Sequence, residues 1–275
     1  MTLPETFTLI RHGHSEANYV QELVKNGEKD VTLPKGLFER HDANMRLTAR
    51  GVDQAIATGE WLKTQGLLFD RYYVSPHTRT RETAVNLSIA DAQWRVDDRF
   101  RERDWGEIHY VNPDNMQDPL SDASRHNRSL SQWYWKPMAG ESLATGVRLR
   151  ADAVMNSLYR REGIKHTLGV THGEFIRTCQ FVIERMTPDQ WEQMDADRAY
   201  KMQNCMVLQY SRHEGGDPTA PLSQHFTWRR ATCPWDESLS WDGGQWVPVK
   251  FRKYTNDDLR ASIAGYEPLF RTDGS

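Results

Sequence analysis

The sequence predicts an α/β protein, a three-layer α/β/α sandwich with a mostly parallel central sheet and an accessory C-terminal segment. Short apolar runs at residues 7–10, 68–74 and 167–170 alternate with longer stretches in which apolar residues recur every three or four positions. Each apolar run ends at polar residues or glycine, which marks the end of a buried strand. Strands alternating with helices build parallel sheets covered on both faces, so this rhythm predicts the three layers.

The first half of the chain predicts two strands, each followed by a helix. The run at 7–10 is the first strand, and a helix begins at Thr48 and ends near Gly66. The apolar stripe of this helix is predicted to be Val52, Ala55, Ile56, Gly59 and Leu62. Residues 68–74 form the next strand, and a second helix starts just beyond Pro76, because the residue before a proline is disfavoured in a helix.

The second half repeats the alternation. Apolar spacing predicts a helix over 143–158, which Gly163 ends, and the strand at 167–170 leads into another helix over 175–186. Thr187 and Gln190 form a capping box with Pro188 at the first helical position, so a further helix begins there. Residues 205–210 are a further strand.

Three segments depart from this pattern. Residues 19–46 and 108–136 are predicted to be irregular insertions. Beyond Ser211 the composition changes and tryptophans accumulate, and residues 241–246 predict a hairpin around a glycine turn. We therefore predict a single domain over 1–275, with a core over 5–211 and an accessory segment over 212–275.

Composition excludes several classes of protein. The 275 residues contain 35 Lys+Arg and 38 Asp+Glu, a net charge of −3, which argues against a nucleic-acid partner. Three cysteines at wide spacing form neither a disulfide framework nor a CxxC metal site, which favours a reducing compartment. With no signal peptide and no apolar span, the sequence predicts a cytoplasmic protein without a membrane partner. The oligomeric state stays open, a homo-oligomer included.

Chemistry-bearing side chains follow the predicted strands. His12 and His172 each come directly after an apolar run and directly before glycine, so a parallel sheet brings both imidazoles to one edge. Arg11 arrives with the first histidine, and Arg79 lies on the opening turn of a helix, where the helix N-terminus adds positive charge. Two guanidiniums and two imidazoles in one crevice predict a site for a compact dianion such as phosphate.

Five motifs occur in order along the chain: LIRHGHSEAN at 9–18, SPHTRTRETA at 75–84, FRERDWG at 100–106, GES at 140–142 and VTHG at 170–173. In this order they resemble the RHG signature, second-arginine helix, acid motif, GES signature and second-histidine motif of the histidine phosphatase superfamily, the phosphoglycerate mutase-like proteins. The resemblance covers about residues 5–211 and implies a phosphoglycerate mutase-like fold.

The resemblance implies roles for the matching residues. His12 is the nucleophile that becomes a phosphohistidine, and Glu102 is the proton donor. Arg11, Arg79 and His172 complete the catalytic set by holding the phosphoryl oxygens. The substrate-binding residues are Arg11, Asn18, Arg79, His172 and Gly173.

The assignment of Glu102 has competitors. A carboxyl about 4 Å from a phosphate charge meets roughly 4 kcal/mol of repulsion at an effective dielectric near 20, which favours its protonated, proton-donating form. The alternative is a surface glutamate paired with Arg101 or Arg103. Asp104 and Glu107 compete for the same role, and only the resemblance selects Glu102.

No metal and no cofactor are predicted. Two permanent positive charges already match a dianion, and the sequence has no aspartate-rich cluster for magnesium. His12 and His14 would supply only two nitrogens on one face, too few for zinc.

Other polar and aromatic residues receive structural interpretations or weaker functional ones. Ser142 is as suited to capping a helix as to touching substrate, and Arg81 points to a different helix face from Arg79. The histidines expected to be exposed or at a rim are His14, His77, His109 and His126. The aromatics that could line the mouth of the site, favouring a substrate with an apolar part, are Trp105, Tyr110, Trp133, Tyr134 and Trp135. The tryptophans after Ser211 are expected to pack over the sheet edge.

The sequence therefore predicts a metal-independent phosphomonoesterase that hydrolyses a phosphorylated small molecule through a phosphohistidine. One alternative is a mutase, which forms the same phosphohistidine but excludes water from it. Ala17 stands where the glycolytic mutases of this family usually carry tryptophan, which favours hydrolysis. The other alternative is a non-catalytic module that binds a phosphorylated ligand and docks through 212–275.

Overall fold

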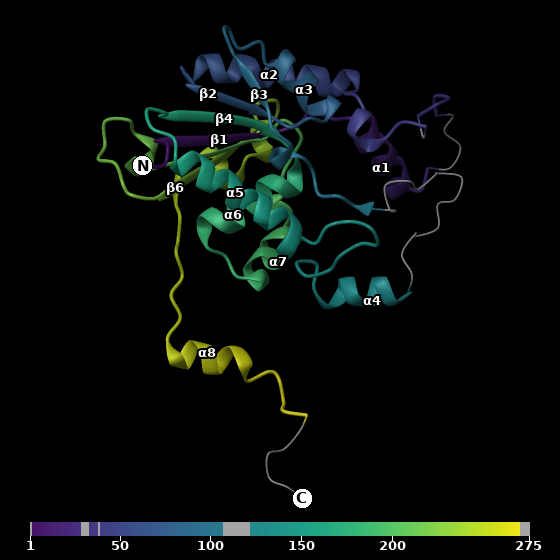
Figure 1. Cartoon of the computed structure of the whole chain (residues 1–275), viewed down its shortest axis with the longest axis vertical. Coiled ribbons are helices and arrows are strands. Elements are labelled where there is room, and N and C mark those ends of the chain that lie inside the picture. The colour runs from purple at the N-terminus through teal and green to yellow at the C-terminus, as the bar shows by residue number, and fades with distance from the viewer. Residues whose placement is uncertain (1, 29–32, 38, 107–121, 270–275) are drawn as a thin grey trace, which may run out of the picture.

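The computed structural model describes residues 2–28, 33–37, 39–106 and 122–269. A seven-stranded sheet in the order β3-β2-β4-β1-β5-β6-β7 lies between two layers of helices (Figure 1). The strands are β1 Thr6–Arg11, β2 Arg71–Val74, β3 Trp94–Val96, β4 His166–Thr171, β5 Val207–Ser211, β6 Trp228–Thr232 and β7 Val247–Pro248. The helices are α1 Glu16–Asn26, α2 Ala49–Thr64, α3 Thr78–Asn86, α4 Asp122–Leu130, α5 Arg148–Tyr159, α6 Gly173–Glu184, α7 Pro188–Ala196 and α8 Asn256–Ile263. The predicted three-layer α/β architecture is confirmed.

The half of the sheet that holds the predicted site is parallel. β4 lies between β1 and β2 and pairs with both in parallel, with Arg11 opposite Thr171 in the register. The carboxyl ends of these three strands therefore meet at one edge of the sheet. From β5 onward the neighbours pair antiparallel, and β6 and β7, from the segment after residue 211, extend the sheet on that side. The boundary between core and accessory segment stays a prediction.

Each face of the sheet has its own apolar core. Phe7 and Leu9 of β1 are fully buried on the face covered by α5 and α6, whereas Ile10 is buried on the face covered by α2 and α3. This alternation follows from the two-residue period of a strand. Each such side chain contributes roughly 1.5–3 kcal/mol by leaving water, so β1 is fixed from both sides just before the chain reaches His12.

The predicted helix boundaries in the alternating part are close to the observed ones. Thr48 caps α2 by accepting a hydrogen bond from the amide of Gly51, and Thr187 and Gln190 form the capping box of α7. The predicted helix over 143–158 begins with a π-helical turn at Leu143–Val147 and continues as α5.

The predicted stripe of α2 was wrong at Ile56, which is 46% exposed. The buried face instead includes Gln54 and Thr58, whose side-chain oxygens hydrogen-bond to backbone groups. The side-chain oxygen of Gln54 accepts from the amide of His14 at 2.9 Å, and the Thr58 hydroxyl donates to the carbonyl of Cys205 at 3.2 Å. A helix that packs on a functional loop can bury polar residues in this way.

Three expectations of irregular or hairpin structure need correction. Segment 19–46 overlaps α1, whose capping box is formed by Ser15 and Asn18 and which ends at Gly27 in the left-handed conformation, with φ of 70°. Segment 108–136 includes α4, while residues 107–121 lie outside the described residues. Residues 241–246 form no hairpin but 3₁₀ turns at Trp241–Gly244, where the indole of Trp241 is buried and Asp242 and Gly243 have positive φ.

Two further findings concern the cysteines and the helices. Cys179, Cys205 and Cys233 are buried free thiols. Within the described ranges, no helix combines the length and apolarity needed to cross a bilayer.

Candidate active site

The loops that follow β1, β2 and β4 bring His12, His77 and His172 together at the carboxyl edge of the sheet. The ring centroids of His12 and His172 are 5.2 Å apart, and those of His77 and His172 are 4.7 Å apart. His12 is 3% exposed and His172 is fully buried. The two histidines singled out in the sequence thus share one site, and His77, expected at a rim, lies beside them.

His12 presents a free lone pair on one nitrogen. Its Nδ1 lies 2.8 Å from the carbonyl oxygen of Gly13, and a carbonyl only accepts, so Nδ1 holds the ring proton and Nε2 keeps its lone pair. Burial, together with the charges of Arg79 and Arg11, lowers the pKa of His12 well below its ordinary value. The ring is therefore neutral at neutral pH and suited to nucleophilic attack.

His172 and Arg11 each have a buried nitrogen without a hydrogen-bond partner in the described part of the chain. When the Ser75 hydroxyl donates to His172 Nε2, His172 Nδ1 carries the ring proton and is a donor. The Nε2 of His172 lies 2.8 Å from the hydroxyl of Ser75, and burial lowers the pKa of His172 well below its ordinary value. Arg11 donates from Nη1 to the carbonyl of Met202 at 2.6 Å, and burial lowers its pKa. Among the described residues, His172 Nδ1 and Arg11 Nε are buried without a hydrogen-bond partner. Buried unpaired polar groups are costly, so these two atoms point to a ligand rich in acceptors.

Gly173 leaves room beside the Arg11 guanidinium. A Cβ at this position would lie 3.4 Å from Arg11 Nε, tighter than most contacts. Gly173 also begins α6, whose N-terminal amides add partial positive charge to the same region.

Arg79 lies in the first turn of α3 and is only 4% exposed. Its Nη1 donates to the backbone carbonyl of Asp42 at 2.7 Å, and its Nη2 donates to Asp42 Oδ2 at 3.0 Å. His77 Nδ1 lies 3.8 Å from the same carboxylate oxygen. No sequence motif pointed to Asp42, which lies in a segment predicted to be an irregular insertion.

Asn18 has a structural role in addition to its predicted one. Its Oδ1 accepts from the backbone amide of Ser15 at 3.3 Å and from Asn204 Nδ2 at 3.0 Å. Asn204 Nδ2 also lies 3.0 Å from the carbonyl oxygen of His12. Asn18 and Asn204 therefore connect α1 to the His12 loop, and direct contact of Asn18 with substrate stays a prediction.

Glu102 lies two residues after the buried Phe100. Burial lowers the pKa of Arg11, and the negative charge of Glu102 opposes that effect. Its Oε1 accepts from the backbone amide of Arg103 at 2.9 Å. The alternative ion pairs go elsewhere, because Arg101 pairs with Glu141 at 2.7 Å and Arg103 pairs with Glu174 at 3.3 Å. Of the two competitors, Asp104 is exposed and accepts from the amide of Gly106, and Glu107 lies outside the described residues.

The GES segment supports the loop that carries Glu102. Burial alone would raise the pKa of Glu141, but hydrogen bonds from Arg101 and Arg150 outweigh it and lower the pKa to about 2. Glu141 Oε2 also accepts from the backbone amide of Asp104 at 3.1 Å. Ser142 caps the following helix by accepting from the amide of Thr145 at 3.1 Å, as the capping interpretation predicts.

Glu174 is an acid that sequence reasoning missed. It follows Gly173 in the first turn of α6 and lies 3.3 Å from Arg103. Burial raises the pKa of Glu174 to about 7, the charge of Glu102 adds to that shift, and Arg103 opposes it. The position of Glu174 directly after His172 and Gly173 does not by itself identify a functional acid, because the sequence does not show that the residue is buried.

Two expectations about side chains near the site were wrong. His14 is buried at 2% exposure, with Nδ1 2.8 Å from the hydroxyl of Thr48 and Nε2 3.2 Å from Glu22. Trp133 is a core residue, 2% exposed, with its ring centroid 3.9 Å from that of Phe181.

The other predictions for surrounding residues had mixed outcomes. Trp135 is 5% exposed, and its ring centroid lies 6.2 Å from that of Trp105, whereas Tyr134 is exposed. His126 and Arg81 are exposed, as expected. His109 and Tyr110 lie outside the described residues. Trp241 and the half-buried Trp235 pack into or against the apolar core, as predicted for the tryptophans after Ser211.

Metal-ligating side chains do not gather in the part of the chain that the structure describes: no group of three or more His, Cys, Asp or Glu residues there could hold a metal ion.

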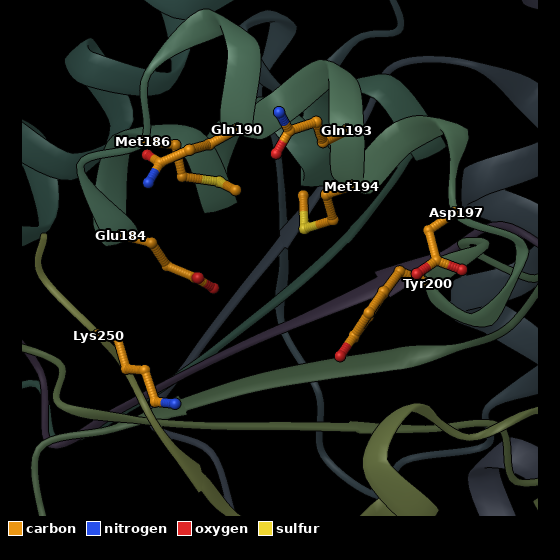
Figure 2. A pocket seen from close by; sticks show the side chains of 8 residues that line it. All are labelled: Glu184, Met186, Gln190, Gln193, Met194, Asp197, Tyr200 and Lys250. Atoms are coloured by element: carbon orange, nitrogen blue, oxygen red, sulfur yellow. The ribbon is translucent and has the colours of Figure 1, made fainter. Parts of the chain in front are cut away.

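A separate cavity of about 310 Å³ lies near the far end of α6 (Figure 2). Its lining residues are Glu184, Met186, Gln190, Gln193, Met194, Asp197, Tyr200 and Lys250. α6 starts next to His172 and reaches Glu184 eleven residues later, roughly 16 Å along a helix. This cavity therefore contains none of the residues predicted for the phosphate site and lies toward the opposite edge of the sheet.

Two curated proteins are similar to this chain in sequence. The 2,3-bisphosphoglycerate-dependent phosphoglycerate mutase of Azorhizobium caulinodans is 30% identical over 176 residues, which cover 61% of this chain and 82% of that protein. The enzyme of the same name from Methylorubrum populi is 28% identical over 170 residues, which cover 60% of this chain and 79% of that protein.

Solved structures share the fold at lower identity. The alpha-ribazole phosphatase of Shigella flexneri has a TM-score of 0.56 and 19% identity, over 81% of this chain and 96% of that chain. A mycobacterial glucosyl-3-phosphoglycerate phosphatase has a TM-score of 0.55 and 21% identity, over 76% of this chain and 91% of that chain.

The family model of the histidine phosphatase superfamily, branch 1, matches residues 7–216. That range includes Arg11 at the end of β1, Arg79 in α3, and His12 and His172 directly after β1 and β4. The chain therefore belongs to branch 1 of the histidine phosphatase superfamily.

Proposed function

We propose that this chain is a metal-independent phosphomonoesterase that acts on a phosphorylated small molecule through a phosphohistidine at His12. The observation that carries the proposal is the hydrogen bond from His12 Nδ1 to the Gly13 carbonyl, which leaves Nε2 as a neutral nucleophile. The unpaired donors of Arg11 and His172 provide the complement for a phosphoryl group beside it.

The reaction has two steps. In the first, the Nε2 lone pair of His12 attacks phosphorus while the ester P–O bond breaks, and Glu102 gives its proton to the leaving alkoxide. In the second, the Glu102 carboxylate takes a proton from water as the oxygen attacks phosphorus, the N–P bond breaks, and inorganic phosphate leaves. Arg11, Arg79 and His172 stabilise the charge on the transferred group in both steps.

The test is release of inorganic phosphate from an aryl phosphate monoester in the presence of a chelator. We expect turnover by the unmodified protein and its loss in His12→Ala, because no other group supplies the nucleophile. His126→Ala is the matched control, since His126 is exposed on α4. Activity that disappears with chelator, or that survives in His12→Ala, contradicts the proposal. Phosphate binding without turnover across a panel of phosphoesters favours the non-catalytic alternative.

A mutase is the second candidate, because the relatives from Azorhizobium and Methylorubrum are named phosphoglycerate mutases at 28–30% identity. Two features favour hydrolysis: Ala17 replaces the tryptophan usual in the glycolytic mutases of the family, and the region after Asn18 lacks their aromatic, glycine-rich continuation. Transfer of phosphate between positions of phosphoglycerate without net phosphate release would support the mutase, because a mutase excludes water from the phosphoenzyme.

A further inference from the structure

Arg79 meets a carboxylate from the chain itself at the edge of the proposed phosphoryl site. Both terminal nitrogens of its guanidinium are used, Nη1 by the backbone carbonyl of Asp42 at 2.7 Å and Nη2 by Asp42 Oδ2 at 3.0 Å. Arg79 is 4% exposed and the Asp42 side chain 15%, so water screens this pair weakly. The backbone carbonyl and the carboxylate of Asp42 thus each accept from one terminal nitrogen, and the carboxylate places a negative charge on the guanidinium that a phosphoryl group would contact.

The segment 40–47, which carries Asp42, contacts α1 at one end and α3 at the other. On one side, Arg40 pairs with Glu16 of α1 at 3.2 Å. On the other, the backbone amide of Leu47 donates to Glu82 Oε2 of α3 at 2.8 Å. Glu82 is three residues beyond Arg79 on the same helix. These contacts hold Asp42 against Arg79.

A phosphoryl group and the Asp42 carboxylate compete for Arg79. Both are anions, both prefer the guanidinium fork, and two like charges on one buried arginine repel each other. Each terminal nitrogen carries two N–H groups, so phosphate can approach Arg79 while the carboxylate is present, but its charge is then opposed by the carboxylate on the same guanidinium.

We propose that Asp42 is an intramolecular competitor for the phosphoryl group at Arg79, which weakens the binding of phosphate monoesters and of the phosphate product. The inference rests on the proposed function, because it takes Arg79 to be a phosphoryl ligand. Asp42 thereby limits how tightly inorganic phosphate holds the site after turnover.

The experiment measures the Kd of inorganic phosphate by calorimetry and its inhibition constant against an aryl phosphate. In Asp42→Asn we expect phosphate to bind about tenfold more tightly, because the amide removes the charge but remains a neutral acceptor for Arg79. Asp42→Ser, which is smaller and also neutral, should change both constants in the same direction, so a folding defect in one variant does not decide the result. Asp53→Asn, on the exposed face of α2, removes the same charge away from Arg79 and should leave both constants unchanged.

The outcomes separate the inference from the proposed function. If Asp42 instead holds Arg79 in position for substrate, Asp42→Asn binds phosphate more weakly and has a lower kcat/KM. That result, or an unchanged Kd in a folded protein that hydrolyses phosphoesters, overturns the inference alone. Absence of phosphate binding and of turnover in the unmodified protein and in both variants overturns the proposed function as well.

Discussion

The imidazole of His12 is a weak base held in one tautomer. Its Nδ1 proton is donated to the Gly13 carbonyl at 2.8 Å, and burial beside Arg79 and Arg11 disfavours a second proton on Nε2. Both effects favour the neutral ring that a nucleophile needs, and they come from the backbone and from tertiary neighbours.

We therefore expect His12 and His172 to stay neutral as the pH falls past 6.5, where solvent-exposed histidines gain a proton. An NMR titration of histidine-labelled free protein between pH 8 and 5.5 measures this directly. The ring resonances of His12 and His172 should not shift, and His12→Ala and His172→Ala assign them. A His12 midpoint at or above pH 6.5 would contradict the account of burial.

Glu102 should matter in proportion to the basicity of the leaving group. Glu102→Gln cannot donate a carboxylic proton, so we expect kcat/KM to fall about 100-fold or more with an alkyl phosphate. With a nitrophenyl phosphate, whose phenolate leaves unaided, the first step should be much less affected. The exposed Asp104 provides the control. Asp104→Asn should leave kcat/KM for both substrates as it is in the unmodified protein. An equal loss with both substrates would argue against a general acid at Glu102.

At the scale of elements, the loop after β1 is fixed by close packing against the start of α2. The amide of Thr48 donates to the carbonyl of His14 at 2.9 Å, and the amide of Gly13 donates to the Thr83 hydroxyl of α3 at 3.0 Å. A Cβ at Gly51 would lie 2.0 Å from the carbonyl oxygen of His14. Glycine is thus required by a backbone approach that also sets the position of His12.

Gly51→Ala should destabilise the protein by about 1–3 kcal/mol, the usual cost of overpacking, and should lower kcat because the His14 backbone must move. Denaturant unfolding and steady-state assays measure the two effects. Gly265→Ala is the control, since a Cβ there meets nothing within 4 Å. Unchanged stability and activity in Gly51→Ala would show that the loop adapts freely.

Elements with strong local signals were predictable, and those fixed by polar contacts were not. Thr48 and Thr187 are capping residues that mark the starts of their helices. The apolar run that contains Phe7, Leu9 and Ile10 indicates a strand, and all three residues are buried. α1 was missed because the charge and glycine content of 19–46 favoured an irregular insertion, although the helix is amphipathic and buries Leu23. The hairpin expected at 241–246 failed because Asp242 and Gly243 take positive φ in a turn that buries Trp241.

At the scale of the whole molecule, charges from distant segments form a connected network around the site. Glu141, from the GES segment, holds Arg101 and Arg150, while Glu174 of α6 holds Arg103. The Arg103 guanidinium also donates to the carbonyls of Glu141 and Trp135, at 2.8 and 2.9 Å. The loop with Glu102 is therefore held by three parts of the chain that no local pattern connects.

The raised pKa of Glu174 predicts a pH-dependent contribution to stability. Between pH 4.5 and about 7 the folded protein holds a proton that the unfolded chain has released, so the free energy of unfolding falls as pH rises through this window. Glu174→Gln removes that contribution. Its stability relative to the unmodified protein should increase by about 2 kcal/mol from pH 4.5 to pH 8.

Urea unfolding of both proteins at several pH values measures this difference, and Glu60→Gln on the exposed face of α2 serves as the control. A difference that stays constant with pH would mean that Arg103 fully compensates the burial of Glu174.

Local apolar runs and motifs were enough to predict the family, the alternating architecture and the meeting of His12, His172 and Arg11, because they mark the strands and their ends. Three contacts became known only from the packed chain: His77 lies beside the two histidines, Asp42 pairs with Arg79, and Glu174 pairs with Arg103. These contacts join residues that are 37 to 95 positions apart in the sequence. Their existence depends on how buried charges find partners once the layers have packed, which no local pattern specifies.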